Sequence, residues 1–201
     1  GLAVDIGTTT VAVYLVDLKT GETEAISSML NPQSTHGGDI MSRMRYTRRN
    51  EGGREDLKES IREGINECIE EVVHEAGIEQ DQIYEGVFVG NTAMHHLFLG
   101  IEPAYVAGSP YVAAREAPIK VKARELDIDI NDSGYVYWLP VSGGWVGPDK
   151  VSVLLVAGHY DDPETTVCID IGTNGEISVG NEDEMLVTSA PAGPALEGAE
   201  I

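Results

Sequence analysis

Residues 3–13 read AVDIGTTTVAV, and residues 168–179 read CIDIGTNGEISV. Both stretches carry Asp-Ile-Gly-Thr at the end of a short apolar run, and both continue into a second apolar run. Short apolar runs of this length are typical of buried strands, and a Gly-Thr pair between them is typical of a turn. The repetition therefore predicts two related sheet units in one chain.

Each unit extends into a predicted three-stranded meander. In the first, strands are expected at 2–6, 10–18 and 23–30, with a turn at 19–22. Both faces of 10–18 are largely apolar, which predicts a strand covered on both sides. In the second, strands are expected at 166–172, 176–180 and 185–190, separated by turns at 173–175 and 181–184.

Helical patterns lie between the two meanders. Asp39 is placed to cap a helix over about 40–49, and an apolar stripe predicts a buried helix over about 54–76 that Gly77 ends. Further elements are expected as a strand at 86–90, a helix from Asn91 or Thr92 to Leu99, one or two edge strands within 101–134, a strand at 135–140 and a helix at 149–158 behind Pro148. Strands mixed with helices predict an α/β fold.

The two meanders suggest two lobes. We assign residues 1–158 to the first lobe and 159–201 to the beginning of a second, with the boundary inside 158–164. The chain opens on Gly1 without a Met and ends on the helix-like ALEGAEI, so we expect it to be a piece of a longer protein.

Composition limits the classes of function. The net charge of −21, from 34 acidic and 13 basic residues, argues against binding nucleic acid or an anionic membrane. No run approaches the ~18 apolar residues of a membrane span, and we expect no secretory leader. Cys68 and Cys168 lack metal-site spacing, so reduced thiols in a cytoplasmic protein are expected.

The repeated turn has the chemistry of a phosphate site. Gly7 and Gly172 permit close approach of a ligand to the backbone. Hydroxyl and N–H donors suited to phosphate oxygens follow in both copies: Thr8, Thr9 and Thr10 in the first, and Thr173, Asn174 and Gly175 in the second. Asp5 and Asp170 precede the turns and are our candidate ligands of a hydrated Mg²⁺. They are also candidate catalytic residues. Facing one another, the turns would clamp a polyphosphate and its metal.

Other polar residues have both a structural and a functional interpretation. Asn91 follows a buried strand and either caps the next helix, faces a ligand, or does both. His95 and His96 are adjacent, so we expect diverging side chains that do not share a metal. Asp39 either faces the cleft or caps its helix, and we favour the cap. Asp149 either orients a water or metal or is a first-turn acid that the helix dipole favours, and we favour the second interpretation.

Glu176 directly follows the second turn and is a third catalytic candidate, which would orient water or metal.

The paired motifs resemble those of the actin, sugar-kinase and heat-shock-chaperone ATPase superfamily. DIGTTT at 5–10 is similar to its first phosphate loop and DIGTNGE at 170–176 to its second. The helix at 147–158 resembles its first connecting helix, in which Gly147, Ala157 and Gly158 would allow close crossing. This resemblance implies a ribonuclease-H-like lobe, ATP and Mg²⁺.

More closely, five segments in this order resemble the reductive activators of corrinoid proteins: 1–22, 31–44, 89–100, 168–177 and 190–201. That family implies an ATPase supporting reduction of cob(II)alamin to cob(I)alamin in a corrinoid protein. It also implies an electron-donating iron–sulfur domain or protein separate from this chain. A homodimer is left open, and without adenosine-binding motifs the chain alone is expected to be inactive.

Two other functions remain open. A sugar or small-acid kinase would share the phosphate loops, although no acid–base residue for a substrate is identified. A non-catalytic, actin-like module would bind nucleotide to assemble or to hold a partner.

Overall fold

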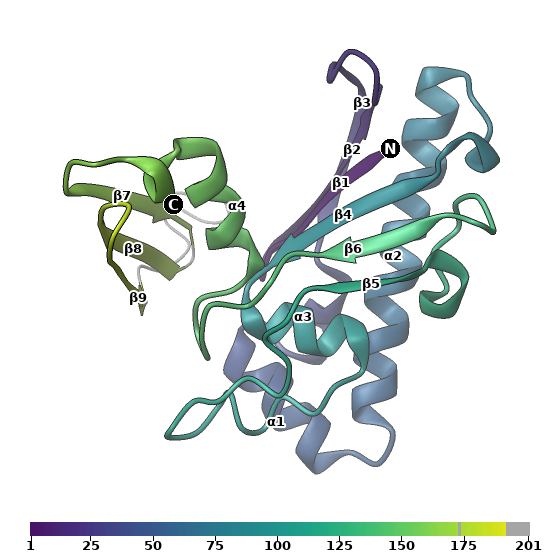
Figure 1. Ribbon diagram of the computed structural model, residues 1–201. Coiled ribbons are helices and arrows are strands. Elements are labelled where there is room, and N and C mark those ends of the chain that lie inside the picture. The colour runs from purple at the N-terminus through teal and green to yellow at the C-terminus, as the bar shows by residue number, and fades with distance from the viewer. Residues whose placement is uncertain (173, 192–201) are drawn as a thin grey trace, which may run out of the picture.

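The computed structural model describes residues 1–172 and 174–191, which form two bodies (Figure 1). The larger contains a six-stranded sheet in the order β3-β2-β1-β4-β6-β5, and the smaller contains a three-stranded sheet β7-β8-β9. The strands are β1 Leu2–Ile6, β2 Thr10–Val16, β3 Thr23–Leu30, β4 Glu85–Gly90, β5 Ile119–Lys122, β6 Tyr135–Trp138, β7 Thr166–Ile171, β8 Asn174–Gly180 and β9 Met185–Pro191. The helices are α1 Ile40–Arg49, α2 Gly53–Ala76, α3 Thr92–Leu99 and α4 Pro148–Ala157.

Both predicted meanders are confirmed. Strands β1, β2 and β3 pair antiparallel, as do β7, β8 and β9. Strand β1 also pairs parallel with β4, and β4 with β6, which gives the larger sheet its mixed α/β character. The first turn of each meander follows the carboxyl end of its first strand, β1 in the larger sheet and β7 in the smaller one.

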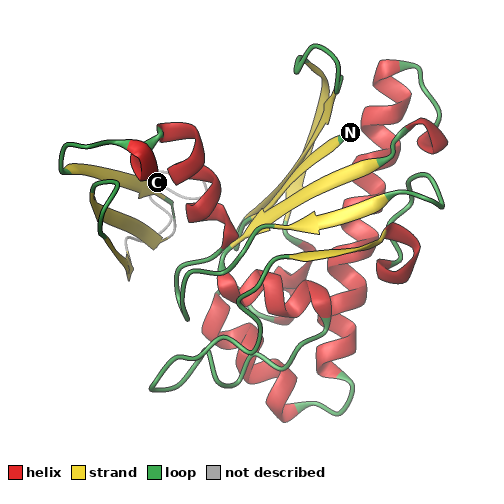
Figure 2. Ribbon diagram, in the orientation of Figure 1, coloured by secondary structure: helices red, strands yellow, loops and turns green. Residues whose placement is uncertain are grey.

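Helix α2 covers one face of the larger sheet (Figure 2). Its predicted stripe is confirmed, because Leu57, Ile61, Ile65 and Ile69 are fully buried in the core and α2 packs against β2 and β3. The predicted second cover of β2 is wrong: Tyr14 is 36% and Ile26 of β3 is 55% exposed on the opposite face. Aromatic and β-branched residues also occur on strand faces that water reaches, so the apolar composition of β2 led to an overestimate of its burial.

Caps define the helix ends as expected. Asp39 accepts a 2.9 Å hydrogen bond from the N–H of Ser42 at the start of α1, and Gly77 ends α2 in a left-handed conformation. A short 3₁₀ helix, η1 Pro32–His36, occupies the predicted loop before α1. In residues 101–134 one strand forms, β5, at the sheet edge, and β6 ends at Trp138 rather than at 140.

Helix α3 carries the adjacent histidines into the core. His95 and His96 are buried, and their Nδ1 atoms lie 3.3 Å apart, so the expected divergence of the two rings is wrong. His96 is held by the carbonyl of Thr92 and by the N–H of Ala114, and the ring of His95 packs edge-on against Trp138. These packing contacts turn the two rings toward one another.

Helix α4 connects the two bodies and passes close to the end of β4. A Cβ on Gly147 would lie 2.5 Å from both the Cα of Asn91 and the carbonyl oxygen of Gly90, so the predicted close crossing is confirmed there. Gly158 has no atom near its would-be Cβ and instead ends α4 with a positive φ. Within residues 1–172 and 174–191, no helix combines the length and apolar character that a membrane crossing requires.

Candidate functional site

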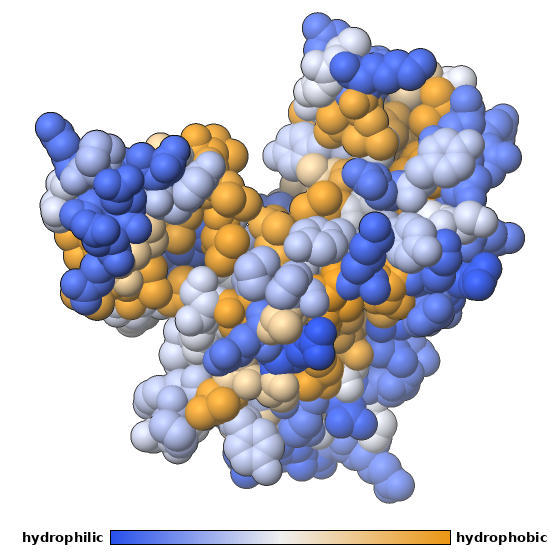
Figure 3. All heavy atoms as spheres, viewed as in Figure 1, coloured by the Kyte–Doolittle hydropathy of each residue, from blue (hydrophilic) through white to orange (hydrophobic). Residues whose placement is uncertain are grey.

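The two repeated turns line one cavity between the bodies. This cavity of about 160 Å³ takes residues from both sheets and from α4: Asp5, Gly7, Thr8, Asn91, Asp149, Asp170, Gly172, Asn174 and Glu176. Figure 3 shows the smaller body standing apart from the larger one, with a hollow between them. Residues far apart in the sequence thus meet where the first strands of the two meanders end.

A network of buried polar groups fixes the first turn. The N–H of Gly7 donates to the carbonyl of Thr10 (2.9 Å), and a Cβ on Gly7 would lie 2.7 Å from that oxygen. The buried amide of Asn31 donates to the carbonyl of Gly7 (2.8 Å), and that of Asn91 to the Thr8 hydroxyl (3.1 Å). The Thr8 hydroxyl is thereby held at the cavity wall.

The predicted cap by Asn91 is confirmed, and the residue also lies at the cavity. Its Oδ1 accepts a 3.0 Å hydrogen bond from the N–H of Met94 and so caps α3, while the residue also lines the cavity. Thr9 and Thr10 belong to the turn but do not line the cavity.

Arg43 supports the backbone of the first turn, a role that no local sequence pattern predicts. Its side chain is fully buried, with Nη2 donating to the carbonyl of Thr8 (2.6 Å) and Nε donating to the carbonyl of Gly37 (2.9 Å). Burial lowers the pKa of Arg43 to about 10, which leaves it charged at neutral pH. The helix α1 is thereby joined directly to the turn.

The second turn joins β7 to β8 and is one residue shorter than the first, since Ile171 pairs with Gly175 whereas Ile6 pairs with Val11. The N–H of Gly172 donates to the carbonyl of Asn174 (3.0 Å), and Asp170 pairs across the strands with Glu176. Glu176 is buried, and its Oε1 accepts from the hydroxyl of Ser189 (3.1 Å). Gly175 pairs with Ile171 in the ladder without lining the cavity, and Thr173 lies outside the described residues.

Four carboxyl groups line the cavity, those of Asp5, Asp149, Asp170 and Glu176, and burial raises the pKa of Asp5, Asp149 and Glu176. Burial between the bodies, and secondarily the charge of Asp170, raises the pKa of Asp5 to about 6, although water still reaches this group. Burial raises the pKa of Asp149 to about 7, with contributions from Glu176, Asp5 and Asp170. Burial and then Asp170 also raise the pKa of Glu176.

Asp149 therefore combines the predicted first-turn position with a place in the cavity wall that the sequence did not favour. Concentrated negative charge of this kind favours binding of a cation.

Lys150 is a second residue that the sequence reading missed. Its fully buried ammonium donates to the carbonyls of Cys168 (3.1 Å) and Glu176 (3.2 Å). Lys150 therefore fastens α4 to both strands that flank the second turn, and its charge also opposes the rise in the pKa of Glu176. A lysine inside the mostly apolar helix α4 was the only sequence signal for this role.

The donor set fits a hydrated divalent cation. In residues 1–172 and 174–191, no three His, Cys, Asp or Glu side chains converge closely enough to ligate a bare ion. Mg²⁺ usually keeps several waters and is held through one or two carboxylates together with substrate phosphates. Asp5 and Asp170, each directly before a turn rich in N–H and hydroxyl donors, match that requirement.

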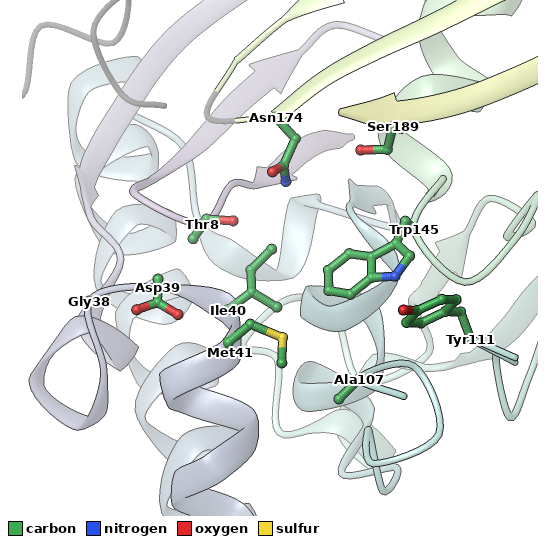
Figure 4. Close-up of a pocket in the computed structure, with 10 residues that line it drawn as sticks. All are labelled: Thr8, Gly38, Asp39, Ile40, Met41, Ala107, Tyr111, Trp145, Asn174 and Ser189. Carbon is green, nitrogen blue, oxygen red and sulfur yellow. The ribbon is translucent and has the colours of Figure 1, made fainter. Parts of the chain in front are cut away.

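A larger, apolar cavity adjoins the first. It has a volume of about 510 Å³ and is lined by Thr8, Gly38, Asp39, Ile40, Met41, Ala107, Tyr111, Trp145, Asn174 and Ser189. Figure 4 shows Asn174 and Ser189 on one side, facing Ile40, Met41 and the indole of Trp145 on the other. Thr8 and Asn174 also line the smaller cavity, so the two cavities share part of their walls.

Comparison with known proteins identifies the fold and family. A model described as the RACo middle region matches residues 1–162, and one described as the C-terminal domain of RACo, the ASKHA domain, matches residues 164–201. A putative 2-dehydro-3-deoxygalactonokinase from Sinorhizobium meliloti aligns with a TM-score of 0.51 at 13% identity, over 94% of this chain and 52% of that one. That likeness shows the actin-like fold alone, as the repeated turns predicted.

Two curated proteins and one solved structure are similar over the whole chain. Identity is 41% to the corrinoid activation enzyme RamQ of Eubacterium limosum, covering 34% of that protein. It is 26% to the [Co(II) methylated amine-specific corrinoid protein] reductase of Methanosarcina barkeri, covering 38%. A structure named reductive activator for corrinoid, iron–sulfur protein superposes with a TM-score of 0.97 at 42% identity, over 100% of this chain and 32% of that one.

The chain thus spans about a third of the length of these relatives. The resemblance to reductive activators of corrinoid proteins is confirmed, as is the actin-like α/β fold. Since the RACo model matches residues 1–162 of 201, the chain belongs to the RACo family and carries part of its ASKHA fold.

Proposed function

We propose that the full-length protein containing this chain hydrolyses ATP and thereby supports reduction of cob(II)alamin to cob(I)alamin in a corrinoid protein. One observation carries the proposal: two Asp-Ile-Gly-Thr turns from separate sheets line a single cavity with four carboxyl groups. The names of the similar proteins supply the corrinoid partner. The proposal also includes a first lobe of residues 1–158, the beginning of a second lobe at residues 159–201, and a cytoplasmic location.

The residues of the cavity have distinct roles in the proposed reaction. Backbone N–H groups of both turns and the Thr8 hydroxyl, oriented by Asn91, bind phosphate oxygens of ATP. Asp5 and Asp170 hold the waters of Mg²⁺, which when bound neutralises phosphate charge. Thr173 and Gly175 belong to the second phosphate turn in the same proposal.

Hydrolysis requires a positioned water. Glu176 orients a water molecule for in-line attack on the γ-phosphorus, and the bond from that phosphorus to the β–γ bridging oxygen breaks. The raised pKa of Glu176 suits it to accept the proton of the water, and Ser189 holds its carboxylate in place. Asp149 lies in the same cavity wall and adds a further carboxyl group to it.

The electron itself comes from elsewhere. Reduction of cobalt(II) to cobalt(I) consumes one electron, which we assign to an iron–sulfur domain or protein outside this chain. ATP turnover at the junction of two bodies changes how the bodies meet, and that change would act on the bound corrinoid protein.

The kinase alternative is disfavoured by the larger cavity. A kinase would place the acceptor beside Thr8 and Asn174, where this cavity opens. Among the described residues that line the cavity, Asp39 alone carries a carboxylate, and it already accepts from the N–H of Ser42. A general base for a sugar hydroxyl is thus not provided by the described lining residues.

Spectroscopy tests the proposal directly. Full-length protein is mixed with a corrinoid protein in the cob(II)alamin state and a titanium(III) donor, with ATP, with a non-hydrolysable analogue, or without nucleotide. We expect loss of the cob(II)alamin absorption only with ATP. Equal loss without nucleotide would refute an ATP-dependent activator, and phosphorylation of a sugar instead would favour the kinase.

A further inference from the structure

Helix α1 concentrates positive charge on an acidic protein. Its ten residues contain Arg43, Arg45, Arg48 and Arg49 and no acid, so it carries four of the 13 basic residues of a chain with net charge −21. Arg43 is buried beneath the first phosphate turn, whereas Arg45, Arg48 and Arg49 are exposed. The exposed three form what we call the α1 arginine surface.

The α1 arginine surface is not neutralised within the molecule. Across the described ranges, 1–172 and 174–191, Arg45, Arg48 and Arg49 form no ion pair or side-chain hydrogen bond. Asp39 acts on Arg45 electrostatically, but its carboxylate accepts from the N–H of Ser42 instead. The dipole of α1 explains basic residues in its last turn, Arg48 and Arg49, and does not account for Arg45.

These arginines border a groove with an apolar floor. The groove, of about 390 Å³, is lined by Met41, Met44, Arg45, Arg48, Arg49 and Ala107. Methionine side chains adapt to differing apolar partners, and arginine forks bind carboxylates in pairs of hydrogen bonds. This combination suits an acidic protein segment with an apolar side chain better than a bare phosphate.

The groove connects to the nucleotide site in two ways. It shares Met41 and Ala107 with the larger cavity, which in turn shares Thr8 with the carboxylate cavity. On the same helix, Arg43 donates to the carbonyl of Thr8 over 2.6 Å. Displacement of the first phosphate turn would therefore displace α1.

We propose that the α1 arginine surface docks an acidic segment of the corrinoid protein, and that Arg43 couples this docking to the first phosphate turn. The inference rests on the proposed function. The remaining surface of the chain, with its large excess of acids, would repel an acidic partner and steer it toward this helix. Arg43 is a positioning residue, because it acts through the backbone of Thr8.

Charge reversal tests the surface. Arg45→Glu, Arg48→Glu and Arg49→Glu are combined in the full-length protein. A matched control combines Lys19→Glu, Lys120→Glu and Arg124→Glu, which reverse three exposed charges in or beside other strands. Binding of a corrinoid protein from the same organism and of poly-L-glutamate is measured at about 0.1 M salt, where the Debye length is near 10 Å. Melting temperature serves as the folding control.

We expect the α1 variant to bind both probes at least tenfold more weakly than the matched control. Binding within twofold of the control would overturn the docking surface, even where cob(II)alamin reduction proceeds and the proposed function stands. The α1 variant could lose poly-L-glutamate binding while the unaltered protein fails to reduce cob(II)alamin. That result would uphold the surface and refute the proposed function. Competition by tripolyphosphate rather than poly-L-glutamate, or an altered oligomeric state of the α1 variant, would also overturn the docking proposal.

The coupling is tested separately by hydrogen–deuterium exchange. In the unaltered full-length protein, a non-hydrolysable ATP analogue should change exchange rates across residues 40–49, and Arg43→Lys should reduce that response. Unchanged exchange of α1 in the unaltered protein with bound analogue would refute the coupling, and this arm requires no variant to fold.

Discussion

The ammonium of Lys150 donates a 3.2 Å hydrogen bond to the backbone carbonyl of Glu176, which joins the connecting helix α4 to the strand behind the second turn. The same group donates to the carbonyl of Cys168 on the neighbouring strand. A single buried cation thus bridges the two bodies that form the cavity.

Removal of this cation should loosen the smaller body. Lys150→Met preserves the apolar stem but leaves two buried carbonyls without this donor, at a cost of about 1–3 kcal/mol in the free energy of unfolding. Lys19→Met, at an exposed turn position, serves as the control and should change stability by less than about 0.5 kcal/mol. Denaturant unfolding of the full-length protein measures both, and equal stability of the two variants would contradict the bridging role.

The elements built from local signals were predictable. Asp39 and Asn91 both cap helices with their own side chains, and Gly77 ends α2 because it adopts a left-handed conformation. The two turns were predictable because the sequence repeats. Each of these features depends on residues within a few positions of one another.

Residues that act across the fold could not be assigned in this way. Arg43 reaches Thr8 across 35 positions, and Lys150 reaches Glu176 across 26. Nothing in the sequence around Arg43 distinguishes its side chain from an exposed one, and the apolar neighbours of Lys150 do not identify its partners. Asp149 joined the cavity only because α4 crosses beside Asn91, where Gly147 permits close approach.

The apolar stripe of α2 should carry much of the stability of the larger body. Ile65 is fully buried, so Ile65→Ala should cost roughly 2–5 kcal/mol in the free energy of unfolding. Ile26, on the open face of the sheet, is 55% exposed, and Ile26→Ala should cost markedly less. Thermal melting compares the two, and an unchanged melting temperature in Ile65→Ala would show that the stripe is not core.

The buried histidines should make the protein sensitive to acid. Burial, with smaller effects of His96 and Arg115, lowers the pKa of His95 from 6.5 to about 3. Between these values the unfolded chain binds the proton and the folded protein does not, so stability is lost as pH falls below 6.5. The loss is at most about 1.4 kcal/mol per pH unit for one proton.

Asp5 and Asp149 oppose this effect, since their pKa values are raised to about 6 and about 7 and their protonation stabilises the fold as pH falls. The contribution of His95 is therefore measured as a difference. The stability advantage of the unaltered protein over His95→Asn should shrink from pH 7 to pH 4. An advantage that is constant over this range would contradict a neutral buried His95.

The central claim is that Asp5 and Asp170, one before each turn, act together on Mg²⁺ and ATP. The most direct measurement is Mg²⁺-dependent ATP turnover by the full-length protein with Asp5→Asn or Asp170→Asn, beside Asp129→Asn as an exposed control. Each site variant should lose on the order of 3 kcal/mol of transition-state stabilisation, about 100-fold in rate, while the control retains its activity. Near-normal turnover in both site variants would contradict the account.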